Sequence, residues 1–293
     1  MNGTRARLSA LCAAFSLVEA CSYGALNPKG PVAADEKVIL FDATATMLTV
    51  VIPVIVCTLA FAWWFRARNP RAARRPDWQY SGRIEFVTWC IPAMIILFLG
   101  GMTWIGSHDL DPHKALRSAV RPVEIEVVSL DWKWLFIYPE ERIATVNELV
   151  IPVNAPVHFK LTSGSVMNSF FIPQLGSQIY TMAGMATQLN LLASTAGTYP
   201  GLSAQFSGDG FSDMRFGVRA VPEEDYRAWL TSTHAGSEQL DPARYDKLAM
   251  PSHHDEPTTF GKVTPGLFDR IVTSRGAPIG SAPTPALAGG RSP

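Results

Sequence analysis

Cysteine and histidine are the residues of this 293-residue chain that could bind a transition metal, and their positions restrict its chemistry. The four cysteines are Cys12, Cys21, Cys57 and Cys90, and none follows residue 90. The remainder of the chain therefore lacks the sulfur ligands of a zinc–thiolate or blue-copper site, and it cannot form a disulfide. The six histidines all lie in that cysteine-free part: His108, His113, His158, His234, His253 and His254. We interpret His158 as an ordinary strand residue and His253–His254 as a solvated pair.

The sequence also lacks the motifs of other common catalytic and binding sites. No Ser-His-Asp spacing and no glycine-rich loop ahead of a helix is evident, so we expect no catalysis within residues 108–222. The 25 acidic residues balance the 25 basic residues, which argues against a nucleic-acid binder. The mean hydropathy of +0.12 is high for a soluble protein and indicates membrane segments.

The first 20 residues are typical of an export signal. Arg5 and Arg7 precede an apolar stretch over residues 8–18 that is too short to span a bilayer. The sequence Val-Glu-Ala-Cys at residues 18–21 resembles a bacterial lipoprotein cleavage box, which predicts that Cys21 is acylated (palmitate) and becomes the mature N-terminus. The alternative is an ordinary or uncleaved signal in which Cys21 has no special role.

Two long stretches without a charged residue follow, at residues 43–65 and 86–107. Each is long enough for a helix to cross the hydrocarbon core, so we predict two transmembrane helices rather than buried helices of a soluble core. Cys57 and Cys90 lie inside them and are interpreted as packing residues.

The charges next to these stretches predict how the chain crosses the membrane. The connecting segment 66–85 contains six arginines, whereas the segments 21–42 and 108–117 have charges of mixed sign. The positive-inside rule puts segment 66–85 in the cytoplasm, and residues 21–42 and everything after residue 107 outside.

From residue 108 to 222 the pattern is that of short strands. Apolar and polar residues alternate at 123–128, 157–161 and 214–221, with Pro and Gly between the strands, which favours an all-β sandwich or barrel. We expect Trp132 and Trp134 to face one side of a strand, and Asp131 and Lys133 to form a surface pair on the other. Residues 223–272 form a C-terminal extension that begins with a helix at 223–230 and contains Tyr245, Phe260 and Phe268 as packing anchors. Residues 273–293 are predicted to be disordered.

This arrangement resembles subunit II of the haem–copper respiratory oxidases, over about residues 21–272. The resemblance implies a fold with three parts in chain order: a two-helix transmembrane hairpin, an all-β cupredoxin-like sandwich, and a short, partly helical C-terminal extension. Four stretches resemble the ubiquinol oxidase (cytochrome bo-type) branch: VSLDWKWLFIYPE (128–140), ATVNE (144–148), SVMNSFFIPQLGSQIYTMAGM (165–185) and SGDGFSDMRF (207–216).

The resemblance also locates a copper site that we expect to be lost. The cytochrome c oxidase branch binds a dinuclear copper centre through two cysteines, two histidines, a methionine and a carbonyl. Here Asn168 stands where one histidine would be, and Phe206 and Gly210 stand in the loop where the cysteines would be. Asp213 and Met214 fall near the second histidine and the methionine. The resemblance therefore implies no cofactor in this chain.

The same resemblance implies the partners. Haem and copper are expected in oxidase subunit I, with the small membrane subunits III and IV completing a proton-pumping terminal oxidase of the bacterial inner membrane. The sandwich would lie in the periplasm. Because no copper is expected here, the electron donor would be ubiquinol from the membrane and not cytochrome c. A cytochrome c oxidase subunit II is disfavoured by the missing cysteines, and a stand-alone membrane-anchored cupredoxin-like binding module is the second alternative.

Glu85, at the start of the second apolar stretch, has two interpretations. It is either a carboxylate at the cytoplasmic interface beside Arg83 or, as the resemblance implies, a proton-entry group at the mouth of a channel in subunit I.

Overall fold

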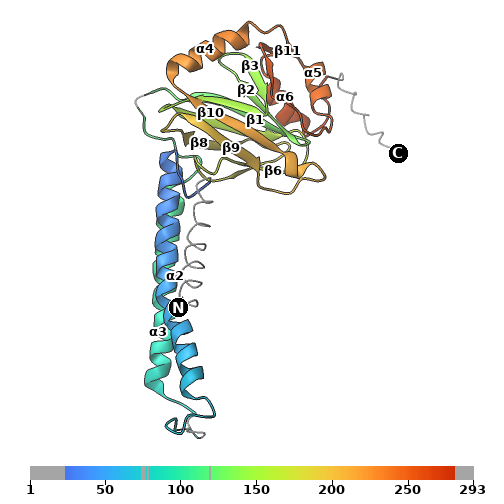
Figure 1. Ribbon diagram of the computed structural model, residues 1–293. Helices are drawn as coiled ribbons and strands as arrows, with labels where there is room; N and C mark the ends of the chain where they lie inside the picture. Colours follow the sequence, from blue (N-terminus) through green and yellow to red (C-terminus); the bar gives the residue numbers. More distant parts are fainter. Residues whose placement is uncertain (1–23, 74–76, 78, 119, 281–293) are drawn as a thin grey trace, which may run out of the picture. The chain divides into compact units, whose positions relative to one another are not determined.

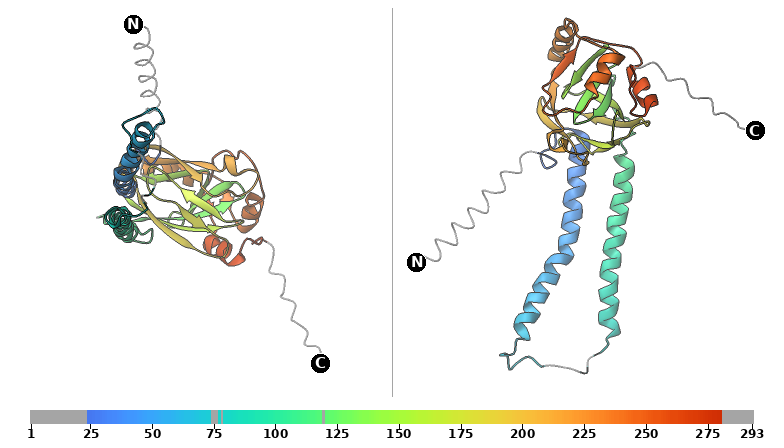
Figure 2. Two further views of the ribbon diagram at one scale, coloured as in Figure 1. Left: turned by 90° about the horizontal axis from the view of Figure 1, so that it is seen from below. Right: turned by 90° about the vertical axis from the view of Figure 1, so that its right-hand side faces the viewer.

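The computed structural model describes residues 24–73, 77, 79–118 and 120–280 (Figures 1 and 2). These residues divide into two compact units. One unit comprises residues 35–111, and the other comprises residues 24–34 together with 112–280. Cys21, the predicted lipidation site, lies outside the described residues.

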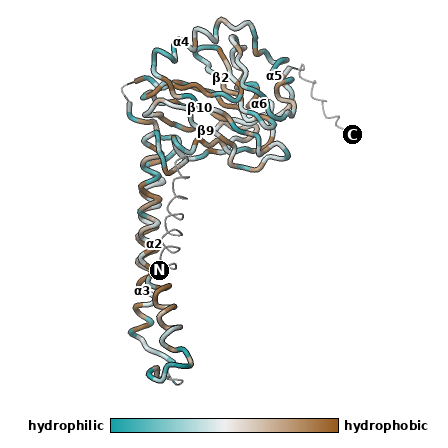
Figure 3. The backbone as a smooth tube through the Cα atoms, viewed as in Figure 1, coloured by the Kyte–Doolittle hydropathy of each residue, from teal (hydrophilic) through white to brown (hydrophobic). Residues whose placement is uncertain are grey.

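The first unit contains α3 (Gly82–Asp109) and all but the first turn of α2 (Pro31–Trp64). Both helices are long and apolar enough to cross a membrane (Figure 3). No residue of their most apolar windows is buried. The hydroxyls of Thr44, Thr58 and Thr88 donate to carbonyls four residues earlier, which satisfies polar groups within the helix itself. α2 begins at Pro31, 12 residues before the apolar stretch predicted at residue 43, so the helix is longer than its apolar part.

The second unit is a β-sandwich followed by a partly helical extension. One sheet has the strand order β12-β3-β2-β1-β5-β8, and the other has the order β4-β10-β9-β6-β7. At the centre of the larger sheet, β1 pairs antiparallel with β2 and parallel with β5. The strands of the sandwich are β1 (Val123–Leu130), β2 (Lys133–Tyr138), β3 (Ile143–Val146), β4 (Glu148–Pro152), β5 (Pro156–Ser163), β6 (Asn168–Phe171), β7 (Ile179–Thr181), β8 (Thr187–Leu192), β9 (Gly197–Ser203) and β10 (Arg215–Val221).

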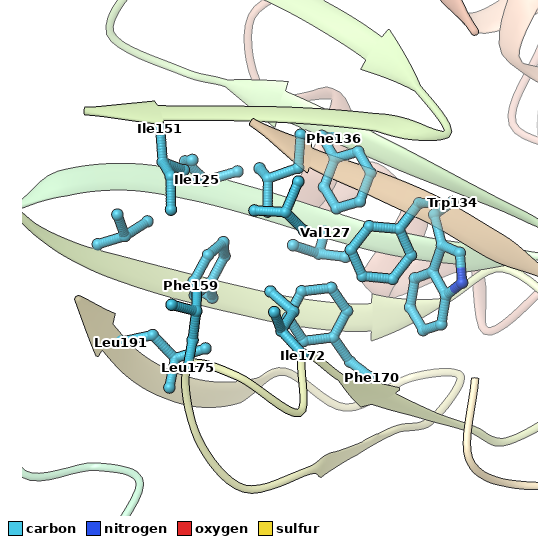
Figure 4. Packing of buried hydrophobic residues seen from close by; sticks show 14 of the residues in the cluster. Ile125, Val127, Trp134, Phe136, Ile151, Phe159, Phe170, Ile172, Leu175 and Leu191 are labelled. Carbon is cyan, nitrogen blue, oxygen red and sulfur yellow. The ribbon is translucent and has the colours of Figure 1, made fainter. Parts of the chain in front are cut away.

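Aromatic side chains fill the space between the two sheets (Figure 4). Trp134 and Phe136 project into it from β2, and both are fully buried. Phe170 from β6 stacks on Phe216 from β10, with ring centroids 5.2 Å apart and planes 8° from parallel. This core joins the sheets and holds β6, β9 and β10 in the places from which they present the candidate site.

A second core lies on the outer face of the larger sheet, where the C-terminal extension covers it. Tyr245, Phe260 and Phe268 are buried there, as the sequence predicted. Because the sheet is covered on both faces, every residue of β2 is buried rather than every second one. The extension comprises α4 (Glu223–His234), β11 (Gln239–Leu240), α5 (Pro242–Leu248), β12 (Thr258–Phe260), β13 (Lys262–Val263) and α6 (Leu267–Ser274).

The end of the extension differs from the prediction of disorder from residue 273 onward. α6 continues to Ser274, and the chain then folds back onto α5. The Asp246 carboxylate accepts hydrogen bonds from the backbone N–H groups of Ile279 and Gly280, at 2.7 and 2.5 Å. The composition of these residues favours disorder, but a carboxylate distant in sequence fixes the backbone up to residue 280.

Residues 24–34 pack on the sandwich and form part of it. The N–H of Lys29 donates to the carbonyl of Gln174 at 2.7 Å, and the carbonyl of Lys29 accepts from the N–H of Ser194 at 2.7 Å. A Cβ at Gly30 would lie 2.2 Å from the carbonyl oxygen of Leu192, so this position has no room for a side chain. The segment just before the first long helix is therefore fixed to the β-domain by its backbone.

Glu126, on β1, is an acid under the extension. Burial and the neighbouring Asp269 carboxylate of α6 raise its pKa to about 7, although Lys160 of β5 acts in the opposite direction. In the unfolded chain the carboxyl ionises near its ordinary value of 4.5. The folded state therefore retains a proton that the unfolded state has released between these two values.

We predict that Glu126→Gln stabilises the chain at alkaline pH and not at acid pH. Between pH of about 5 and 8 the wild-type protein loses stability, because ionising Glu126 is harder in the folded state. Allowing for solvent screening, the variant should gain about 1 kcal/mol near pH 8 and almost nothing near pH 5. Thermal unfolding of the detergent-purified full chain measures this. The control is Glu256→Gln, an exposed acid in the segment before β12 that is not among the causes of the Glu126 shift, and a pH-dependent gain of equal size there would contradict the assignment.

Candidate functional site

The positions where copper ligands were predicted to be lost lie at the start of β6 and in the loop between β9 and β10. Asn168 is fully buried at the start of β6. Its Oδ1 accepts a hydrogen bond from the Ser203 hydroxyl at 3.1 Å, and its Nδ2 donates to the carbonyl of Val166 at 3.2 Å. The amide thus uses its polar atoms to join β6 to β9.

The loop at residues 206–210 is closed by Trp132. The indole Nε1 donates to the carbonyl of Ser207 at 3.0 Å. A Cβ at Gly210 would lie 2.4 Å from the Trp132 ring, so the indole occupies the space that a side chain at residue 210 would need. Phe206, at the other predicted ligand position, is 71% exposed and packs against Phe211, with ring centroids 5.6 Å apart.

Met214 links this loop to Asn168. Its side chain is buried, and its thioether sulfur lies 3.9 Å from the Ser207 hydroxyl. Its carbonyl accepts from the N–H of Ser203 at 3.1 Å, and Ser203 in turn bonds to Asn168. The structure therefore brings the predicted positions into one connected region through hydrogen bonds and packing.

The C-terminal extension contributes two histidines to the same region. The His253 ring stacks on Trp132, with centroids 4.6 Å apart. His254 Nε2 lies 3.5 Å from Asp213 Oδ2, and His253 Nδ1 lies 4.0 Å from the same oxygen. The side chains remain 49% and 77% exposed, so the pair is partly solvated as predicted, but each histidine also contacts the loop.

The prediction that Lys133 forms a surface pair is wrong. Lys133 does point away from Trp134, but the extension covers that face of the sheet. Its side chain is 3% exposed and its Nζ lies 3.1 Å from Asp255 Oδ2. The Nζ also donates to the carbonyl of Met250 at 3.1 Å and bonds to the Ser252 hydroxyl. This buried ion pair holds the segment that carries His253 and His254.

Trp132 also differs from its prediction. It precedes β2, with a φ of +68°, and lies in the tight turn between β1 and β2 rather than within a strand. Trp134 lies in the strand and is fully buried in the first core. The turn rotates the Trp132 indole onto the 207–210 backbone.

Glu85 belongs to the helical unit and is not part of this region. It lies in the first turn of α3, with an exposed side chain, and its N–H donates to the carbonyl of Ser81 at 3.0 Å. A carboxylate is favourable there because the N-terminal end of a helix has a partial positive charge.

Two segments of the chain match known families. Residues 123–221 match the periplasmic domain of cytochrome c oxidase subunit II, and residues 234–274 match the COX aromatic rich motif. The chain is 52% identical over 257 residues to cytochrome bo(3) ubiquinol oxidase subunit 2 of Pseudomonas aeruginosa, covering 88% of this chain and 78% of the relative. It is 51% identical over 269 residues to ubiquinol oxidase subunit 2 of Acetobacter aceti, covering 91% and 87%.

The chain belongs to the ubiquinol oxidase subunit 2 family. Quinol oxidase subunit 2 of Bacillus subtilis is a more distant relative, at 35% identity over 253 residues, covering 86% of this chain and 79% of the relative. The matched segments also confirm the predicted cupredoxin-like sandwich and agree with an extension rich in aromatic residues.

The residues of this ubiquinol oxidase subunit 2 homologue do not fit a dinuclear copper centre. Copper–thiolate chemistry needs cysteine sulfur, and this loop contains none. Asn168 already uses its side chain to join two strands, and the indole of Trp132 fills the space at Gly210. Among the described residues, no group of three or more His, Cys, Asp or Glu side chains is placed to hold a metal ion.

We predict unequal effects from breaking the two halves of the Lys133–Asp255 pair. Asp255→Asn removes the partner of a buried ammonium and should cost about 3 kcal/mol, whereas Lys133→Met leaves a carboxylate that is 32% exposed and should cost less. The double variant should recover part of the loss. Thermal unfolding of the full chain and hydrogen exchange at residues 250–256 measure these effects.

The control for this prediction is Arg227→Met, which breaks an exposed ion pair to Glu223 at 2.9 Å. Exposed pairs contribute about 0–1 kcal/mol. If Asp255→Asn were no worse than this control, the buried pair would not be what holds the segment.

Proposed function

We propose that this chain is the non-redox subunit 2 of a proton-pumping ubiquinol oxidase, which oxidises ubiquinol and reduces oxygen to water in aerobic respiration. The observation that supports this most strongly is the region around Trp132. Its indole packs on the loop where a copper-binding relative would need ligands, and no cysteine is available in the exported domain. A soluble electron donor that docked there would find no group to reduce, so a donor from the lipid phase is required.

The remaining parts of the complex follow from this proposal. Haem and copper reside in oxidase subunit I, and the small membrane subunits III and IV complete the assembly. Ubiquinol reaches subunit I from within the bilayer, without cytochrome c. The role of this chain is to support assembly and to cover the outer face of subunit I.

The proposed location is the bacterial inner membrane, with the β-domain in the periplasm. Support comes from the two long apolar helices and from the arginines of segment 66–85, which favour the cytoplasmic side. After removal of a signal peptide at residues 1–20, Cys21 becomes an acylated N-terminus. Mass spectrometry of the mature N-terminus tests this separately.

The decisive experiment supplies the purified complex with two electron donors in turn. Oxygen consumption should be rapid with a short-chain ubiquinol, and it should not exceed the background with reduced cytochrome c. Rapid oxidation of cytochrome c would overturn the proposal. The second candidate is a stand-alone membrane-anchored binding module. Co-purification in detergent distinguishes the two, because only a subunit co-purifies with haem-containing partners.

Glu85 is the proposed proton-entry carboxylate of this subunit. We predict that Glu85→Gln slows ubiquinol oxidase turnover by about tenfold or more, because a carboxylate that relays protons loses that ability as an amide. Haem content and assembly should be unchanged. Asp77→Asn, which neutralises the acid in the preceding loop, is the matched control and should retain normal turnover. Normal turnover in an assembled Glu85→Gln complex would reject the proton role.

A further inference from the structure

The end of α2 carries a compact turn with three exposed arginines, Arg66, Arg68 and Arg71. Asn69, at the centre of the turn, is less exposed than these arginines. None of the ion pairs found in the described part of the chain involves any of the three guanidinium groups. The turn therefore presents a concentrated positive charge that the described residues do not neutralise.

Asn69 organises this turn through three hydrogen bonds. Its Nδ2 donates to the carbonyl of Trp64 at 2.6 Å, and its Oδ1 accepts from the N–H of Arg71 at 3.1 Å. Its own N–H donates to the carbonyl of Arg66 at 3.0 Å. These bonds close the end of the helix and fix the backbone on both sides of Arg68. The arginines are thus held near one another by a built turn and are not spread along an open loop.

Arg66 is fixed further by Trp63. Its guanidinium carbon lies 4.6 Å from the centroid of the Trp63 ring, and its Nη1 donates to the Trp63 carbonyl at 2.9 Å. A guanidinium has five N–H donors in a planar fork, so most of them remain for an external acceptor. Tryptophan at the end of an apolar helix favours the level of the lipid headgroups. Once α2 is inserted in a bilayer, this arrangement would hold Arg66 at the depth where phosphate groups lie.

We infer that this turn, Arg66–Arg71, is a binding site for the headgroup of an anionic phospholipid. Guanidinium forks match the geometry of phosphate oxygens, and basic residues near an anionic lipid surface are attracted to it. A lipid is favoured over a protein partner because the turn continues directly from an apolar helix end with exposed aromatic rings, which lipid chains cover. The inference depends on membrane insertion of α2, which the proposed function also assumes, and not on oxidase activity.

Native mass spectrometry of the detergent-purified full chain tests this site. Phosphatidylglycerol and phosphatidylcholine are offered at equal concentration, and wild-type protein should retain phosphatidylglycerol at least about tenfold better. The triple variant Arg66→Gln, Arg68→Gln, Arg71→Gln should lose that preference. A variant with the same loss of charge elsewhere, Lys114→Gln, Arg117→Gln, Arg121→Gln, should keep it. Equal retention of both lipids by wild-type protein, or equal losses in the two triple variants, would overturn the inference.

Two further arms separate an organised site from charge alone. Asn69→Ala keeps every arginine but removes two of the bonds that hold the turn, so the preference should fall severalfold. An unchanged preference in Asn69→Ala would contradict the site as described. Inorganic phosphate at millimolar concentration should not displace the lipid, and full displacement would assign the site to free phosphate instead. Because turnover is not measured, failure here leaves the proposed ubiquinol oxidase function to its own test.

Discussion

The contact between the Trp132 indole and the backbone of residues 207–210 is the constraint on which the rest of the account depends. The ring lies where a side chain at Gly210 would have to be, and its Nε1 is bonded to the carbonyl of Ser207. The family resemblance predicted that these positions are where copper ligands would stand. Here the Trp132 ring and its hydrogen bond to Ser207 hold the loop, and the side chains of Asn168 and Ser203 join β6 to β9. The domain keeps the sandwich, and the side chains described at this loop do not fit a copper–thiolate centre.

The second feature that shapes the molecule is the cover that the C-terminal extension forms over the larger sheet. It converts an ordinary sandwich sheet into one that is buried on both faces, with Lys133 and Asp255 as a charged anchor inside the contact. The same segment places His253 on Trp132, so the extension and the loop at residues 206–210 both contact one side chain. Stability of the extension and the structure of the candidate site are therefore linked through the residues 250–255.

The parts of the fold that local pattern determines could be predicted from the sequence. The uncharged stretches predicted both long helices, and the alternation of apolar and polar residues predicted the main strands. Tyr245, Phe260 and Phe268 were predicted as packing anchors because isolated aromatic residues in a polar segment usually pack. Lys133 could not be predicted in the same way. Its charge suggested solvent, and its partners Ser252 and Asp255 lie more than a hundred residues later. The turn at Trp132 and the backbone fixed by Asp246 depend likewise on contacts between distant segments. The ligand positions Asn168, Phe206 and Gly210 came from family resemblance, and only the structure reveals what fills their space.

Copper titration of the detergent-purified full chain tests the central claim most directly. Metal content is measured after desalting, and the visible spectrum is recorded at each addition of copper. If Trp132 and the cysteine-free loop have replaced the metal site, copper will be removed by desalting and no thiolate-to-copper absorption will appear. A purple protein that retains two copper ions per chain would contradict the account.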